Sequence, residues 1–212
     1  WSVNNSIFTS KVNRVALNGS ILYDINNWLN VSYKGGLNTF NDNRFQRISA
    51  GSLSGAQGIG SMQFDAIEFQ EQDHNLLFNL NRDLTQDLNL RAIVGANYNQ
   101  RSSDQTSVNG LGIVTRGIDL ITKVSTVTPN TGKTAISKRR LYAAFTDMTL
   151  GYKNYLFLGL TGRNDWSSTL PANNRSYFYY SGNASLILTE AFNIKSKALT
   201  NAKIRVSYAK VG

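Results

Sequence analysis

The sequence predicts an all-β chain that forms a segment of an antiparallel transmembrane β-barrel, with about eight strands. Three observations support this fold class. Apolar and polar residues alternate with a period of two over long segments, as in strands with one apolar and one polar face. Short turns alternate with long connections rich in Gly, Ser and Asn, an asymmetry typical of outer-membrane barrels. The composition, with 11% aromatic residues, 17 Gly and only 2 Pro, favours strands and turns over long helices.

The first hairpin is predicted from two alternating segments that flank Asn26-Asn27. In residues 14–25, one face carries the apolar set Val15, Leu17, Gly19, Ile21, Tyr23 and Ile25. After the Asn pair, the apolar set is Leu29, Val31, Tyr33, Gly35 and Leu37. A tight turn between two long alternating runs predicts a β-hairpin.

Three more hairpins follow by the same alternation. The second surrounds Thr85-Gln86-Asp87, and the third joins residues 139–150 to 155–163 through Gly151-Tyr152-Lys153-Asn154. The fourth pairs residues 177–188 with 203–211. Most of these strands exceed the roughly 5 to 6 residues that are common in soluble sheets.

The long connections are predicted at 41–60, 102–137 and 164–175, and the short turns near 26, 86 and 153 therefore lie at the other strand ends. Aromatic residues gather near both ends, as interfacial girdles require. Those near the short turns are Tyr23, Trp28, Tyr152, Tyr155 and Phe192, and those near a long connection are Trp166 and Tyr177 to Tyr180.

Composition excludes several other classes. The net charge of +9 comes from 22 scattered Lys and Arg residues, with a run only at Lys138-Arg139-Arg140, so no nucleic-acid partner is expected. Without Cys there is no disulfide, thiolate metal site or thiol nucleophile. The sequence contains no run of about 18 apolar residues, so it predicts no transmembrane helix. The first residues lack a signal-peptide pattern, and we expect the chain to continue at both ends.

No motif proposes catalysis, a cofactor or a metal site, so the chain is not expected to be an enzyme. The single His74 is expected to face solvent or a lumen at the edge of a strand, because no second His or Cys accompanies it. The glycines of 55–60 lack the Lys-Ser/Thr of a phosphate loop and predict a mobile loop. Asn41-Asp42-Asn43 lacks the EF-hand spacing and is expected to form a turn.

The most distinctive segment is Leu160-Thr161-Gly162-Arg163-Asn164-Asp165-Trp166-Ser167-Ser168-Thr169-Leu170-Pro171, followed by the aromatic run 177–180. It strongly resembles the TGRNDWSSTLP…FYPS signature of the SusC/RagA family of TonB-dependent transporters in Bacteroidetes. The run from Lys203 to Gly212 resembles the KLRxSYxxVG strand of that family. One departure is Tyr180, which stands where the family pattern usually has Pro.

The resemblance implies a 22-strand barrel of the cell outer membrane, with an N-terminal plug and energy supplied through TonB. It also implies a SusD-like surface lipoprotein as a lid and a bulky nutrient, a glycan or peptide, as cargo. Residues 1–212 would then be a partial TonB-dependent receptor β-barrel domain in contact with membrane lipid. The plug, the TonB-contacting segment and the remaining strands are absent from them.

Two sets of candidate site residues follow. The family signature comprises Arg163, Asn164, Asp165, Trp166, Ser167 and Ser168. Alternation alone proposes lumen or cargo contacts at Arg91, Asn97, Asn99, Arg101 and Arg205, with the connections 41–60 and 102–137 facing cargo or lid. Arg163 and Asp165 are expected to pair or to share a hydrogen-bond network, and Trp166 either lies at the membrane interface, the favoured role, or stacks on a sugar.

Two alternatives from other classes remain open. Eight strands can close into a self-contained outer-membrane barrel that acts as an adhesin or structural anchor. A soluble glycan-binding β-sandwich also shows alternation, with loops at two ends.

Overall fold

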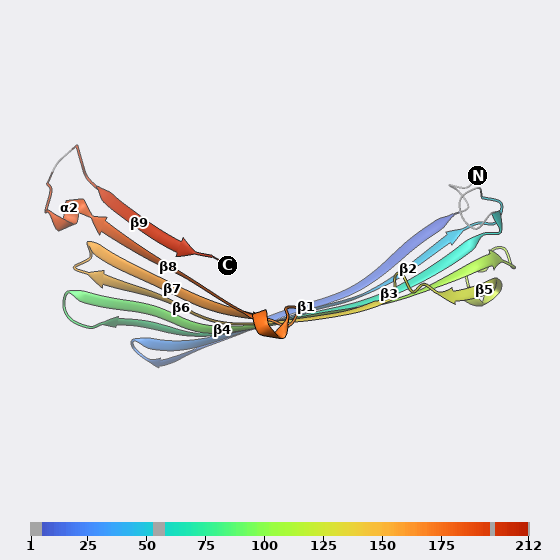
Figure 1. Cartoon of the computed structure of the whole chain (residues 1–212), viewed down its shortest axis with the longest axis horizontal. Coiled ribbons are helices and arrows are strands. Elements are labelled where there is room, and N and C mark those ends of the chain that lie inside the picture. Colours follow the sequence, from blue (N-terminus) through green and yellow to red (C-terminus); the bar gives the residue numbers. More distant parts are fainter. Residues whose placement is uncertain (1–5, 53–57, 196–197, 212) are drawn as a thin grey trace. The chain divides into compact units, whose positions relative to one another are not determined.

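The structure is a computed structural model that describes residues 6–52, 58–195 and 198–211. In this part of the chain, nine strands form one antiparallel sheet (Figure 1). The sheet order is β1-β2-β3-β4-β6-β7-β8-β9, and β5 pairs with β4. The strands are β1 (Ile7–Asn26), β2 (Leu29–Ile48), β3 (Ser61–Asp83), β4 (Leu88–Ile113), β5 (Val124–Pro129), β6 (Ala135–Tyr152), β7 (Leu156–Ser167), β8 (Ser176–Ile187) and β9 (Lys203–Lys210).

Short helical turns lie in the connections: η2 (Ile121–Lys123), η3 (Ala172–Asn174) and α2 (Leu188–Ala191). Within the described ranges, no helix has both the length and the apolar character needed to cross a membrane.

The chain divides into two compact units, and each is described by itself. The first unit comprises Trp1–Leu17, Leu37–Glu71 and Arg101–Lys138, and the second comprises Asn18–Gly36, Gln72–Gln100 and Arg139–Gly212. Strands β1 to β4 and β6 contribute residues to both units. Strand β5 belongs to the first unit, and β7 to β9 belong to the second.

The predicted short turns are confirmed, and all lie in the second unit. At the first turn, the Asn26 side-chain oxygen accepts hydrogen bonds from the backbone N–H groups of Trp28 (3.1 Å) and Leu29 (2.9 Å). Between β6 and β7, Lys153 and Asn154 have φ angles of 48° and 60°, the left-handed conformation that a tight hairpin turn requires. The fourth hairpin is also confirmed, with Ile187 opposite Lys203 and Tyr180 opposite Lys210.

The long connections are shorter than the sequence predicted, because β2 and β4 extend into the predicted ranges. Strand β2 continues to Ile48, so Asn41-Asp42-Asn43 lies inside a strand and its prediction as a turn was wrong. Strand β4 continues to Ile113, and β5 folds back on it with Val108 opposite Pro129. Cross-strand hydrogen bonding outweighs the turn preference of Asn and Asp at these positions. Strand β5 also raises the count from the expected eight to nine among the described residues.

Two other connections differ from expectation. The connection between β8 and β9 lies at the same end of the sheet as the short turns. It is longer than those turns and contains α2. It is tied back where the Leu188 N–H donates to Ala202 O (2.7 Å). In the glycine-rich segment 55–60, residues 55–57 lie outside the described residues, while Gly58 and Gly60 have φ angles of 87° and 81°.

The sheet buries almost no hydrophobic core. Among the described residues, the only buried hydrophobic side chains are Met62 and Ala143. In the part of the chain that the structure describes, the strands form one sheet and no second layer packs on it, so the β-sandwich alternative was wrong.

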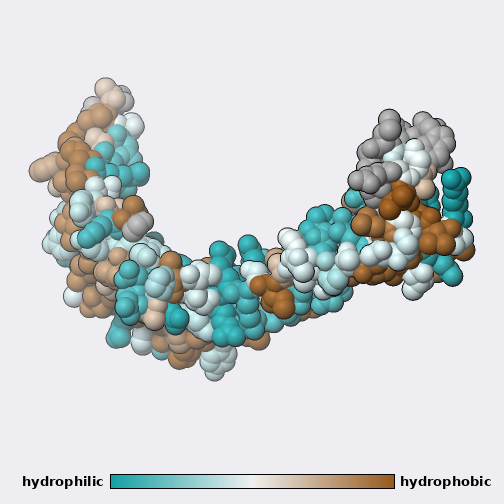
Figure 2. All heavy atoms as spheres, turned by 45° about the vertical axis from the view of Figure 1, so that its right-hand side comes forward, coloured by the Kyte–Doolittle hydropathy of each residue, from teal (hydrophilic) through white to brown (hydrophobic). Residues whose placement is uncertain are grey.

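The apolar residues instead form one exposed face of the sheet in the second unit. Many of them, on β1, β4, β7 and β9, are more than half exposed. They include Ile21 (68%), Tyr23 (65%), Val94 (53%), Leu160 (58%), Ile204 (53%), Val206 (68%) and Tyr208 (66%). In the left-hand part of Figure 2, where β7 to β9 lie, hydrophobic residues gather on one side of the strands and hydrophilic residues on the other. Exposure of this extent requires a cover other than water.

Candidate functional site: a polar network opposite an apolar face

The polar face of the second unit is organised around Asp73 on β3. Its carboxylate accepts hydrogen bonds from the side-chain amides of Asn97 (3.3 Å) and Asn99 (3.2 Å) on β4, and from Asn75 on β3. Asn97 also donates to Asn75 Oδ1 (2.8 Å). Because residues two apart lie on the same side of a strand, these four side chains share one face. Three donors on one carboxylate fix the orientation of the amides.

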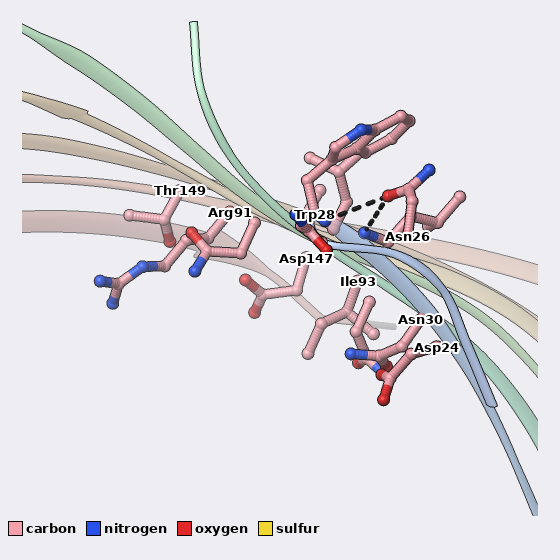
Figure 3. A pocket seen from close by; sticks show the side chains of 14 residues that line it. Asp24, Asn26, Trp28, Asn30, Arg91, Ile93, Asp147 and Thr149 are labelled. Atoms are coloured by element: carbon pink, nitrogen blue, oxygen red, sulfur yellow. Dashed lines mark hydrogen bonds between the residues drawn. The ribbon is translucent and has the colours of Figure 1, made fainter. Parts of the chain in front are cut away.

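Closer to the short turns, the same face is hollowed. Asn79 donates to Asn30 Oδ1 (2.8 Å), and Asn89 donates to Asp83 Oδ1 (2.8 Å). A hollow of about 860 Å³ lies beside them, and its polar lining includes Asp24, Asn30, Asn79, Asn81, Arg91, Asp147 and Thr149. Figure 3 shows Asp24, Asn30, Ile93 and Asp147 pointing to one side of the strands, and the Trp28 indole on the other. Charged and amide groups facing open space can bind a polar solute.

In the family signature, Arg163 and Asp165 pair as predicted. Arg163 Nε lies 3.0 Å from Asp165 Oδ1 and also donates to the Tyr179 hydroxyl (3.2 Å). The Arg163 guanidinium carbon lies 5.4 Å from the centre of the Phe145 ring. The three strands β6, β7 and β8 are therefore joined by one charged side chain on the polar face.

The other signature residues stabilise the connection after β7. Asn164 exchanges hydrogen bonds with the Ser176 hydroxyl (2.9 and 3.1 Å). The Ser167 hydroxyl lies 2.8 Å from that of Thr169. Ser168 binds β6 twice, because its N–H donates to Arg140 O (2.9 Å) and its hydroxyl accepts from Arg140 N (2.8 Å). These contacts explain why short polar side chains suit these positions.

Trp166 lies on the opposite face from Arg163 and Asp165. It pairs with Tyr142 on β6, and Leu158 and Leu160 occupy the same side of β7. The indole is 40% exposed among these apolar neighbours. The structure therefore separates Trp166 from the polar candidates, and of its two proposed roles the location fits the interfacial one.

His74 also lies on the apolar face, in the middle of β3, so its predicted location at a strand edge was wrong. Its ring stacks between Tyr33 (centroids 6.0 Å apart) and Tyr98 (5.9 Å), and its Nδ1 lies 2.6 Å from the Tyr33 hydroxyl. Tyr98 in turn contacts Tyr142 at 5.1 Å. With Trp166 opposite Tyr142, these five residues form an aromatic row across β2, β3, β4, β6 and β7.

A second group of aromatic residues lies at the short turns, as expected. The Arg82 guanidinium is 4.9 Å from the Trp28 ring, and Tyr152 contacts Tyr155 edge-on at 5.7 Å. Neighbouring turns are joined where the Lys153 ammonium lies 3.5 Å from Asp87 Oδ2. The Asp87 carboxylate, helped by Tyr152, raises the pKa of Lys153 above its usual value.

The first unit has a polar network of its own. Asp42 accepts from Ser10 (2.7 Å) and pairs with Arg44 (2.7 Å). Asp65 accepts from Ser107, which is fully buried. Arg47 pairs with Asp119 beside a hollow of about 390 Å³ that is lined by 115–119.

The five proposed lumen residues are divided between the units. Arg91, Asn97 and Asn99 share the polar side of β4 in the second unit. Arg205 lies opposite Ser185 at the edge strand β9 of the same unit. Arg101 belongs to the first unit, where it pairs with Glu71 (2.8 Å) and lies over the Phe69 ring (5.7 Å).

The candidate site residues predicted from the sequence did not include Asp73, Asp24 or Asp147. Asp73 precedes Asn75 and Asn79 by two and six positions, so the period-two rule could have found it. The same rule places His74 with Leu76 and Phe78. For Asp24 and Asp147, only the pairing of distant strands reveals that both line one hollow.

In the second unit, the described residues of the antiparallel sheet form one apolar, exposed face and one polar, hydrogen-bonded face. This is the construction of a membrane β-barrel wall.

Comparison with known proteins supports the same fold. No family model and no curated protein matches the chain. Among solved structures, it is similar to a chain of the RagAB peptide transporter, with a TM-score of 0.86 and 16% identity over 98% of this chain and 23% of that one. A chain of the RagAB peptide importer in the open-open state gives a TM-score of 0.82 at 17% identity and the same coverage. The chain has the fold of a segment that spans about a quarter of those neighbours.

Proposed function

We propose that this chain is part of the wall of an outer-membrane β-barrel that imports a bulky nutrient, a peptide or a glycan. The observation that carries the proposal is the two-faced sheet: apolar side chains that need a lipid cover lie back to back with an amide- and charge-rich face suited to a wet lumen. The likeness to RagAB peptide importers supports transport, and a peptide cargo in particular.

The dimensions of the apolar face agree with a membrane span. On β4 the apolar side runs from Leu88 to Tyr98. Ten residue steps measure about 33 Å along a strand, and at the tilt of a barrel strand they cover roughly 25 Å of membrane. Aromatic residues lie at both limits of this stretch in the second unit, where girdles are expected.

Energy coupling and lid closure belong to the same proposal. The signature at Arg163 to Ser168 and the RagAB likeness support a TonB-dependent importer with a SusD-like lipoprotein lid. In this proposal, the plug and the TonB contact belong to parts of the transporter outside residues 1–212. We infer transport without catalysis because the structural neighbours are transporters.

Membrane insertion can be tested with paired cysteine variants, since this chain contains no Cys. Val94→Cys lies on the apolar face, and its neighbour Ile93→Cys lines the polar hollow. In outer-membrane vesicles of the complete protein, a membrane-impermeant maleimide should label position 93 and spare position 94 until detergent is added. Equal labelling of both positions before detergent would contradict a barrel wall.

Transport is tested by deleting the gene and measuring uptake of fluorescent oligopeptides and oligosaccharides by intact cells. We expect uptake of one class to be lost on deletion and to be abolished in the wild type by a protonophore. Uptake of both classes that persists unchanged in the deletion strain would contradict the proposed function, even if the protein is inserted in the membrane.

A further inference from the structure

We propose that Arg140, with Gln100 and Ser168, binds the head-group phosphate of an anionic membrane lipid beside the apolar face. This inference rests on the proposed membrane location, and it adds a specific lipid contact on the outside of the wall. The site lies wholly within the second unit.

The position of Arg140 relative to the aromatic row is the first step. Tyr142 on β6 is a member of the row, and Arg140 lies two residues before it on the same side of the strand. Tyr142 pairs with Trp166, and the Arg140 backbone binds Ser168, two residues beyond Trp166. The arginine is therefore one step past the row of Tyr and Trp side chains, on the side away from Leu158 and Leu160.

The second step is that Arg140 is held in place. Its backbone N–H donates to the Ser168 hydroxyl (2.8 Å), and its carbonyl accepts from Ser168 N (2.9 Å). Its Nε donates to Gln100 Oε1 (3.1 Å), and that oxygen also accepts from the Tyr98 hydroxyl (2.9 Å). A guanidinium oriented through Nε leaves its two terminal nitrogens available as a fork of donors.

The third step is charge. Among the described residues, no carboxylate forms an ion pair with Arg140, although the chain pairs five other cations in this way. An exposed and oriented cation next to interfacial aromatic rings matches the level at which lipid phosphates lie. The planar fork also suits the geometry of a phosphate group. Tyr98 and Tyr142 would then flank the first methylene groups of the same lipid.

The test uses the complete protein, purified in detergent that contains equal amounts of phosphatidylglycerol and phosphatidylcholine, with retained lipids counted by native mass spectrometry. Arg140→Gln should lower phosphatidylglycerol retention by about fivefold, the effect of one basic residue at a membrane surface. Arg140→Lys should lose less, because the charge stays. Arg91→Gln is the matched control, since it removes the same charge from the polar face, and it should retain lipid as the wild type does.

Three results would overturn the proposal: equal retention of the two lipids by the wild type, equal retention by Arg140→Gln and the wild type, or displacement of phosphatidylglycerol by millimolar inorganic phosphate. The last would assign the site to free phosphate. A folded barrel, checked by heat-modifiable migration, must accompany each measurement. Failure of the wild-type protein to fractionate with membranes would instead contradict the proposed function itself.

Discussion

The Arg163 guanidinium contacts both the Asp165 carboxylate, at 3.0 Å from Nε, and the Phe145 ring, at 5.4 Å from the guanidinium carbon. One side chain of the family signature thus joins β6 to β7 and, through the Tyr179 hydroxyl, to β8. The pair is partly exposed, so its contribution to stability is modest.

Arg163→Ala should lower the free energy of unfolding of the complete protein in lipid vesicles by about 1 kcal/mol, through loss of the ion pair and the ring contact. Guanidinium titration followed by tryptophan fluorescence measures the change. Arg163→Lys keeps the charge without the fork and should fall between wild type and Ala. Equal losses in both variants would show that the charge contributes nothing.

A charge introduced on the apolar face should lower the folding stability far more than the same charge at the adjacent residue, which faces the polar side. Val94→Arg places a guanidinium toward lipid and should cost about 2–4 kcal/mol of folding free energy at this depth. Ile93→Arg points into the polar hollow and should cost less than 1 kcal/mol. Folded and unfolded fractions in vesicles measure both, and similar costs would mean that the two faces have similar surroundings.

Gly95 lies where the polar face is tightly packed by the side chains of neighbouring strands. A Cβ there would lie 2.4 Å from Phe145 Cζ and 2.8 Å from Leu77 Cδ2. Gly95→Ala should destabilise the protein by about 1–3 kcal/mol. At Gly19, nothing lies within 4 Å of an added Cβ, so Gly19→Ala should be neutral or slightly stabilising. Adding Phe145→Leu should recover part of the Gly95→Ala loss, as measured by a double-mutant cycle.

Asp73 should be the most sensitive acid of the polar face. Asp73→Ala leaves the amides of Asn75, Asn97 and Asn99 without their acceptor and should cost about 1–3 kcal/mol in the same titration. Asp24→Ala is the control, since Asp24 lines the hollow without a side-chain hydrogen bond in the described part of the chain, and it should stay within about 0.5 kcal/mol of wild type. A larger loss for Asp24 would contradict the network.

The ion pair between the turns predicts a pH effect at high pH. The Asp87 carboxylate raises the pKa of Lys153 from its usual 10.5, so the pair stabilises the fold fully below pH 10.5 and is lost as the pH rises through the raised value. Asp87→Asn should return the Lys153 pKa toward 10.5, as measured by NMR of methylated lysines. Glu190→Gln, an acid in another connection at the same strand ends, should leave the Lys153 pKa unchanged.

The sequence alone determined the two faces of each strand, because side chains alternate strictly along an extended chain. The rule placed Asn97 and Asn99 on one side of β4 and Leu90 and Val94 on the other before any pairing was known. The same rule places His74 on the side of Leu76 and Phe78 and away from the adjacent Asp73 and Asn75. The sequence also predicts the short turns, because Asn26 and Asn154 favour turn geometry locally.

The tertiary structure decided strand length and partnership. Residues 41–43 have a strong turn preference, yet they lie in β2 because neighbouring strands supply hydrogen-bond partners for their backbone. The hydrogen bonds also depend on strand register. Asn97 donates to Asp73, and Arg140 binds Gln100 and Ser168, only because the register brings these residues together. These hydrogen bonds join residues 22 to 40 positions apart, so they form only when the strands have paired in the correct register.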